Sequence, residues 1–256
     1  MRCWRSVSAN SSPVSDDVTA ALDPLVVVPA FNEVACIADV VRAVRAGGWR
    51  VLVIDDGSTD GTAAAAQQAG AAVLTLPINL GVGGALRTGF RYAVEHGERC
   101  IVQVDADGQH DAEQITGLLR ELETTSADMV VGSRFAGGGS HSMSRVRRWS
   151  ISLLASVAAR TAGIRVTDPT SGFRAIRSPL LEAFAEEFPQ YYLGDTWEAT
   201  VVAARRGYRI TEVPVSMRQR QGGSPSADVY ASIRSMVRAL ATLVIGPSID
   251  LPERPR

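Results

Sequence analysis

Short runs of consecutive apolar residues alternate, in the first half of the chain, with segments in which apolar residues recur every three or four positions. The runs are rich in β-branched residues and predict buried strands at 25–28, 51–54, 72–76, 100–104 and 129–131. The periodic segments predict helices from 37 to the glycine pair at 47–48 and at 62–69, 85–95 and 112–122. This alternation predicts an α/β fold in which helices sandwich a mainly parallel central sheet.

The second half of the chain is less regular. It predicts a helix from Ser144 to about Ala162, a strand at 173–176, a helix at 196–206, a strand at 208–217 and a last helix at 229–245. Residues 1–23 are rich in Ser and Asp without periodicity, which predicts a disordered tail. We therefore expect one main domain over 24–226, followed by an amphipathic helix and tail over 227–256.

Polar turns follow three of the predicted strands. Their sequences are Pro-Ala-Phe-Asn-Glu at 29–33, Asp-Asp-Gly-Ser at 55–58 and Asp-Ala-Asp-Gly-Gln-His at 105–110. In α/β sheets ligands bind beyond the carboxyl ends of the strands, and parallel strands bring those ends to one rim. The pattern predicts a ligand site at that rim.

The third of these turns is a candidate metal site. Asp105 and Asp107 flank a single residue at a strand end, and Gln109 adds a neutral oxygen two positions later. Such oxygen ligands suit Mg²⁺ or Mn²⁺, which proteins hold with one or two carboxylates together with substrate phosphates. A solvated acidic turn is the alternative, but the position after a buried strand favours the metal. His110 ranks below Gln109 as a further ligand.

The other two turns suit a nucleotide. Asp56 lies at its strand end, where it can accept hydrogen bonds from a base or a ribose. Phe31 can lie against a base, and Glu33 can either accept from one or serve as an acid in the first turn of a helix. Asp60 and Thr62 are better explained as helix caps.

Composition and motifs exclude several other functions. The net charge of −1 gives no field that would attract nucleic acid. The segment Gly81-Val82-Gly83-Gly84 has Leu86 where a dinucleotide fingerprint needs its last glycine. All 26 basic residues are arginine, so a lysine-containing phosphate loop is absent and phosphate contacts by basic side chains must use guanidinium groups.

The expected location is the cytoplasm. The three cysteines are scattered without metal-ligand spacing, which indicates free thiols in a reducing compartment. No run approaches the ~20 apolar residues of a membrane span, and no apolar core of a secretory signal is present near the start.

The ordered set of motifs resembles family 2 glycosyltransferases, and within them the polyprenol-phosphate (dolichol-phosphate) mannosyltransferase branch. The resemblance covers roughly residues 25–226. It is carried by the three turns above, with the second extended to Asp-Asp-Gly-Ser-Thr-Asp-Gly-Thr at 55–62, and by Asn79 with Gly81 and Gly84, Gly-Ser-Arg at 132–134 and Asp-Pro-Thr-Ser-Gly-Phe-Arg at 168–174. It implies a GT-A nucleotide-diphospho-sugar transferase fold, with 24–226 as the catalytic domain, and inversion at the anomeric carbon.

The resemblance also implies residue roles. By motif position, the nucleotide sugar would be held by Pro29, Phe31, Glu33, Asp56 and Asp105, and the divalent metal with the diphosphate by Asp105, Asp107 and Gln109. The residues implied for catalysis and acceptor phosphate are Asp107, Arg134, Arg148, Ser152 and Arg220. Arg145, Arg148 and Ser152 share one face of a predicted helix, which a basic surface face would also explain.

The expected function is therefore transfer of a hexose, of the mannose or glucose type, from a nucleotide-diphosphate sugar to a polyprenyl phosphate. One alternative is a transferase of the same fold that acts on a soluble or glycan hydroxyl, for which Asp168 or Asp195 would be the candidate base. Another is a catalytically silent relative that binds nucleotide sugars.

The last predicted helix has two interpretations. Its apolar stripe suits either the interface of the inner membrane face, giving peripheral contact with the membrane, or packing on the protein's own core. The stripe comprises Ile233, Met236, Val237, Leu240 and Val244, with Arg234 and Arg238 beside it.

Overall fold

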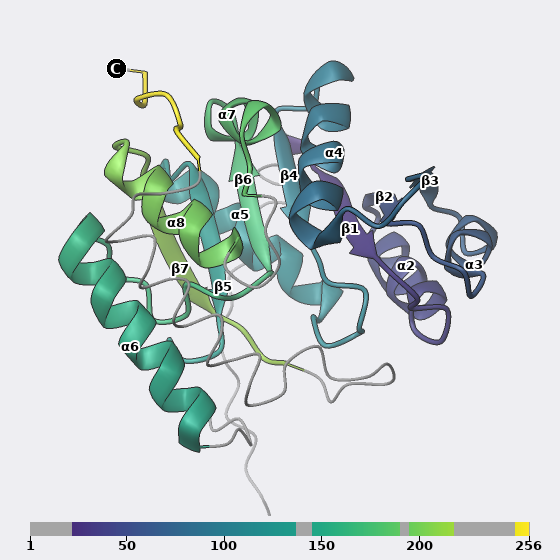
Figure 1. The fold of residues 1–256 in the computed structure, drawn as a ribbon, viewed down its shortest axis with the longest axis horizontal. Coiled ribbons are helices and arrows are strands. Elements are labelled where there is room, and N and C mark those ends of the chain that lie inside the picture. Colours follow the sequence, from purple (N-terminus) through teal and green to yellow (C-terminus); the bar gives the residue numbers. More distant parts are fainter. Residues whose placement is uncertain (1–21, 137–144, 190–194, 218–248, 256) are drawn as a thin grey trace, which may run out of the picture.

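The computed structural model describes residues 22–136, 145–189, 195–217 and 249–255. Its central feature is one seven-stranded sheet with strand order β3-β2-β1-β4-β6-β5-β7 (Figure 1). The strands are β1 (Leu25–Ala30), β2 (Arg50–Asp55), β3 (Ala72–Thr75), β4 (Cys100–Gln103), β5 (Met129–Ser133), β6 (Arg174–Arg177) and β7 (Ile210–Pro214). Neighbouring strands run parallel except around β6, which is antiparallel to both β4 and β5. The predicted mainly parallel α/β fold is confirmed.

Helices cover both faces of the sheet. They are α2 (Ile37–Ala46), α3 (Thr62–Gln68), α4 (Gly81–Glu95), a short 3-10 helix (Ala112–Gln114), α5 (Ile115–Thr124), α6 (Arg145–Ala162), α7 (Leu180–Glu186) and α8 (Asp195–Arg205). Apolar residues of α2, α3 and α5 form the core on one face, and those of α4, α6, α7 and α8 form the core on the other. Each central strand is therefore buried on two sides, which explains its unbroken apolar sequence.

Two helix starts differ from the prediction by three or four residues, and each is associated with a carboxylate that accepts backbone hydrogen bonds. Helix α4 begins at Gly81, four residues earlier than expected, because the Asp56 carboxylate accepts hydrogen bonds from the backbone N–H groups of Leu80 and Gly81. The segment from Ala112 begins as a 3-10 turn in which the N–H of Glu113 donates to Asp111.

Residues 249–255 form the last described segment and pack on the core described above. Ile249 and Leu251 are buried in the cluster formed with α7 and α8. The Arg254 guanidinium donates to both carboxylate oxygens of Asp128, which is 1% exposed. The predicted helix at 229–245 and all but the last two residues of the predicted tail at 1–23 lie outside the described residues.

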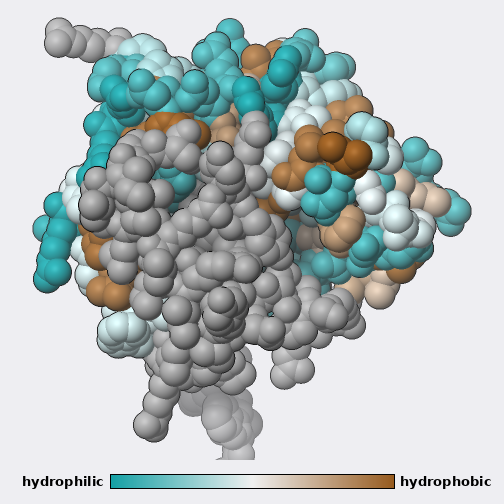
Figure 2. Space-filling view, in the orientation of Figure 1, coloured by the Kyte–Doolittle hydropathy of each residue, from teal (hydrophilic) through white to brown (hydrophobic). Residues whose placement is uncertain are grey.

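On the face that Figure 2 shows, the hydrophobic residues of the described part appear as separate patches among hydrophilic ones. The large apolar side chains that are exposed are Phe31, Val34, Ile78, Leu80 and Trp149. Within the described part of the chain, no helix has the length and apolar character needed to cross a membrane.

Candidate active site

A cavity of about 250 Å³ lies at the rim where β1, β2 and β4 end. The chain passes from β1 outward to β2 and β3 and then returns to the other side of β1 with β4, so this rim is the point where the strand order reverses. Ligands bind at such points in α/β sheets. The cavity is lined by Pro29, Ala30, Phe31, Glu33, Asp56, Asn79, Gly81, Val82, Ala85, Asp105, Ala106 and Asp107.

The turn after β1 is held against the turn after β2 by several hydrogen bonds, three of which involve Asn32 or Glu33. The Asn32 N–H donates to the Ser58 hydroxyl, the Thr59 N–H donates to the Asn32 side-chain oxygen, and the Glu33 N–H donates to the Thr62 hydroxyl. These bonds fix the backbone of the turn, and Phe31 within it is 46% exposed and lines the cavity. An exposed aromatic face beside a pocket is suited to stacking on a base.

Asp56 has a structural role that the sequence did not reveal. Its two carboxylate oxygens accept the N–H groups of Leu80 and Gly81 at 2.7 and 2.8 Å, and so cap α4 from a neighbouring strand end. Burial raises the pKa of Asp56, although these two hydrogen bonds oppose the shift and the charge of Asp55 adds to it. Because each carboxylate oxygen has a second lone pair, Asp56 can still accept from a ligand in the cavity.

The turn after β4 is shaped by local contacts. The Gln109 N–H donates to Oδ1 of Asp107 at 3.0 Å, and Gly108 between them has a φ of 73°, which favours glycine. The Asp105 N–H donates to Nδ1 of His110, whose ring stacks on Phe173. His110 is therefore a support of this turn through Nδ1.

Gly172 packs directly behind the Asp105 carboxylate. A Cβ atom at this position would lie 2.5 Å from Oδ1 and 2.7 Å from Oδ2 of Asp105, closer than side chains tolerate. The Asp105 carboxylate can therefore lie where it does only because this position of the 168–174 motif has no side chain.

The charges around the cavity suit a divalent cation. Four of the lining residues are carboxylates (Glu33, Asp56, Asp105 and Asp107), and the lining contains no basic residue among those the structure describes. A nucleoside diphosphate in such a pocket would face like charges, unless a cation lay between them. Within the described ranges, no group of three or more His, Cys, Asp and Glu side chains is arranged so that it could hold a metal ion without further ligands. Two carboxylates with a diphosphate remain a suitable oxygen set for Mg²⁺ or Mn²⁺.

Beside this cavity, Arg134 and Asp168 form a buried ion pair. Nε and Nη2 of Arg134 donate to the two oxygens of Asp168 at 2.6 and 2.8 Å, and Asp168 has no exposed surface. Burial lowers the pKa of Arg134, but its hydrogen bonds and charge interaction with Asp168 and the charge of Asp105 raise it overall, so the guanidinium stays charged. Nη1 has no hydrogen-bond partner among the described residues, and this edge can meet a ligand.

The structure brings together most of the sequence-predicted nucleotide and metal residues. Pro29, Phe31, Glu33, Asp56, Asp105 and Asp107 line the one cavity, and Gln109 adjoins it in the same turn. Arg134 interacts electrostatically with Asp105, whereas Ser152 lines a separate groove along α6. Arg148 lies in α6 as predicted, and Arg220 falls outside the described residues. The pairing of Asp168 makes it unsuited to act as a base.

Comparisons with known proteins show the family of the chain. The sequence profile described as Glycosyl transferase family 2 matches residues 25–184. An undecaprenyl-phosphate mannosyltransferase of Micrococcus luteus is 36% identical over 210 residues, covering 78% of this chain and 85% of that protein. A polyprenol monophosphomannose synthase of Mycolicibacterium smegmatis is 32% identical over 213 residues, covering 78% of each chain.

Solved structures confirm the fold. Glucosyl-3-phosphoglycerate synthase from Mycobacterium tuberculosis, in complex with Mn²⁺ and uridine-diphosphate-glucose, matches with a TM-score of 0.70 and 22% identity. The match covers 92% of this chain and 82% of that one. The same protein with Mg²⁺ and uridine-diphosphate matches with a TM-score of 0.67 and 20% identity.

Proposed function

The chain belongs to glycosyl transferase family 2, and we propose that it transfers a hexose from a nucleotide-diphosphate sugar to the phosphate of a polyprenyl phosphate lipid. The two relatives named for undecaprenyl and polyprenol phosphates support this acceptor. The observation that carries the proposal is the arrangement of charge. Four carboxylates line the donor cavity, and beside it the Arg134 guanidinium has one nitrogen, Nη1, that bonds to none of the residues the structure describes.

The donor would occupy the acidic cavity. Phe31 would lie against the base, Asp56 would accept from the nucleoside, and Asp105, Asp107 and Gln109 would hold Mg²⁺ or Mn²⁺ with the diphosphate. When bound, the cation would offset the diphosphate charge and stabilise the departing nucleoside diphosphate. The neighbouring complexes with Mn²⁺ or Mg²⁺ support this part of the proposal.

The acceptor phosphate needs little help from a base. A phosphate monoester has a second pKa near 6, so it is largely a dianion at pH 7 and already nucleophilic. One of its oxygens would attack the anomeric carbon from the face opposite the diphosphate, the bond from that carbon to the diphosphate oxygen would break, and the configuration would invert. Arg134 would orient the phosphate, and Arg148 and Arg220 are proposed as further contacts.

The burial of Asp168 favours this acceptor over a hydroxyl. A hydroxyl must lose its proton as it attacks, which requires a base within hydrogen-bond reach. Asp168 directs both oxygens at Arg134 and has no exposed surface. This argues against Asp168 as the base, whereas Asp195, the other candidate, begins α8 and its side chain lies outside the described part of the structure.

Replacing Arg148 tests the acceptor assignment. Loss of a charge-assisted contact, roughly 1.5–3 kcal/mol, should lower the efficiency of transfer in Arg148→Ala by about 10- to 150-fold. Donor affinity, measured by calorimetry, should stay at the parent value. Arg148→Lys should restore only part of the activity, because a point charge cannot reproduce the guanidinium fork.

Arg160→Ala is the matched control, since Arg160 is an exposed arginine in the last turn of the same helix. If both Arg148 variants transfer the hexose at the parent rate, Arg148 does not contact the acceptor and is only a surface charge. Transfer to the free alcohol, but not to its phosphate, would establish the hydroxyl-acceptor alternative instead.

A further inference from the structure

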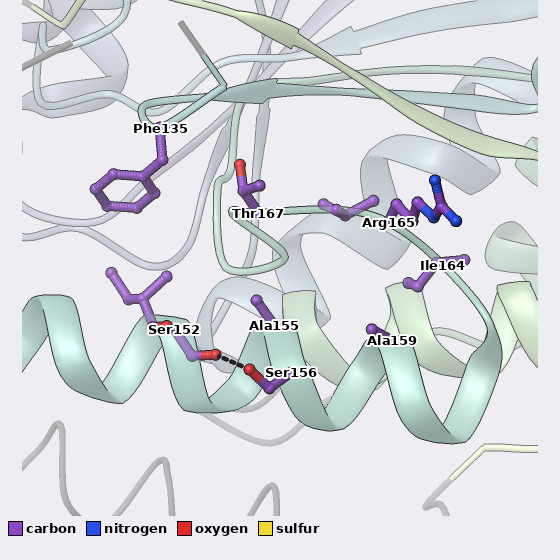
Figure 3. A pocket seen from close by; sticks show the side chains of 10 residues that line it. Phe135, Ser152, Ala155, Ser156, Ala159, Ile164, Arg165 and Thr167 are labelled. Atoms are coloured by element: carbon purple, nitrogen blue, oxygen red, sulfur yellow. Dashed lines mark hydrogen bonds between the residues drawn. The ribbon is translucent and has the colours of Figure 1, made fainter. Parts of the chain in front are cut away.

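An apolar groove of about 470 Å³ runs along α6, separate from the donor cavity. Figure 3 shows Ser152, Ala155 and Ala159 of α6 on one side and Thr167 on the opposite side, with Phe135 at one end. The groove is lined by Phe135, Ile151, Ser152, Ala155, Ser156, Ala159, Ile164, Arg165, Val166 and Thr167. Its volume falls in the range typical of small-molecule sites.

The groove presents mainly apolar surface, and two of its three hydroxyl groups have partners within the protein. The Ser156 hydroxyl donates to the Ser152 carbonyl, and the Thr167 hydroxyl bonds to Ser133 and Glu212. Three buried aliphatic residues, Ile151, Ile164 and Val166, contribute to the lining. Only Arg165 contributes a charge. Such a surface favours a hydrocarbon ligand.

One end of the groove adjoins the ion pair beside the donor cavity. Phe135 follows Arg134 in the chain, and Thr167 precedes Asp168. A phosphate held at the open edge of Arg134 would therefore leave its hydrocarbon chain at the mouth of the groove. We propose that the groove binds the first isoprene units of the acceptor lipid, an inference that rests on the proposed function.

The size of the groove sets how much of the lipid it can hold. An apolar cavity of about 150 Å³ in another protein accommodates benzene, which has six carbon atoms. By that measure a groove of about 470 Å³ holds roughly 19 carbon atoms, or nearly four isoprene units. The acceptor tail would then be recognised near its phosphate, and the remaining units would extend beyond the protein.

Acceptors of different length test this in solution without vesicles. Isopentenyl phosphate has one isoprene unit and farnesyl phosphate has three. Burial of two further methylene groups already corresponds to roughly a tenfold gain in affinity, so the parent KM for farnesyl phosphate should be at least about tenfold lower. Ala155→Phe fills the groove and should abolish this preference. Arg160→Phe adds the same ring to an exposed residue of α6 outside the groove and should keep it.

The results of these assays distinguish a failure of the proposed function from a failure of the groove assignment. Transfer to neither phosphate, with transfer to another acceptor, would refute the proposed function and the groove with it. Transfer to farnesyl phosphate without a length preference, or a preference retained in Ala155→Phe, would refute the groove alone.

A farnesyl phosphate analogue with a diazirine on its third isoprene unit gives a test that needs only the parent chain. Cross-links to 155–159 or 164–167 would support the groove. Cross-links confined to 229–245 would show that the C-terminal segment contacts the tail and would overturn the proposal.

Discussion

Gly172→Ala tests whether the position of the Asp105 carboxylate governs activity. Ordinary contacts of a Cβ atom begin at 3.4 Å, whereas the added Cβ would lie 2.5 Å from Oδ1 of Asp105. The carboxylate or the turn must therefore shift by the difference, about 0.9 Å. A misplacement of about 1 Å can cost on the order of 100-fold in rate, so we expect kcat/KM to fall by about that factor.

The matched control is Gly117→Ala in α5, where an added Cβ would meet nothing within 4 Å. Circular dichroism should show that both variants are folded, and calorimetry with Mn²⁺ should show weaker donor binding only in Gly172→Ala. Steady-state assays with saturating acceptor would then give kcat/KM for the donor. Parent-level kcat/KM and donor affinity in folded Gly172→Ala would refute the assignment of Asp105 to the metal and diphosphate.

Three further predictions follow from buried carboxylates. Asp168→Asn should lower the free energy of unfolding by about 3 kcal/mol, because it leaves Arg134 buried without its counter-charge, and an unchanged denaturation midpoint would contradict the ion pair. Because burial raises the pKa of Asp56, donor affinity should fall with decreasing pH above the ordinary aspartate range, and Asp56→Asn should remove that dependence from a calorimetric pH profile. Arg254→Ala should lower the denaturation midpoint, because it leaves the Asp128 carboxylate buried without its guanidinium partner, and parent-level stability would show that the C-terminal contact adds nothing.

The order of strands and helices followed from local sequence. Continuous β-branched runs such as 25–28 and 51–54 predict buried strands because a parallel sheet covered on both faces leaves no solvent side. The same logic placed the turns at 29–33, 55–58 and 105–110 at one rim, where the structure joins them in one cavity. Cys36 and Cys100 are buried free thiols, and burial raises the pKa of Cys100 to about 12, as expected of core residues.

The features that sequence reasoning missed depend on contacts between distant segments. The antiparallel direction of β6 is set by its pairing between β4 and β5, and helix α7 was not predicted. Asp168 pairs with Arg134 across 34 positions, and Gly172 makes room for Asp105. The periodicity of apolar residues within one segment cannot predict contacts with a distant segment. The motif at 168–174 signalled that these residues matter without showing what they touch.

Mass spectrometry of the transfer product tests the central claim most directly. The full chain would be incubated with Mg²⁺ or Mn²⁺, a panel of nucleotide-diphosphate sugars and either a short polyprenyl phosphate or the matching free polyprenol. We expect one donor to yield a polyprenyl phosphate that carries a single hexose, with no product from the free alcohol and none in the presence of chelator. A hexose on the free alcohol alone, or no hexosyl lipid phosphate from any donor, would contradict the account.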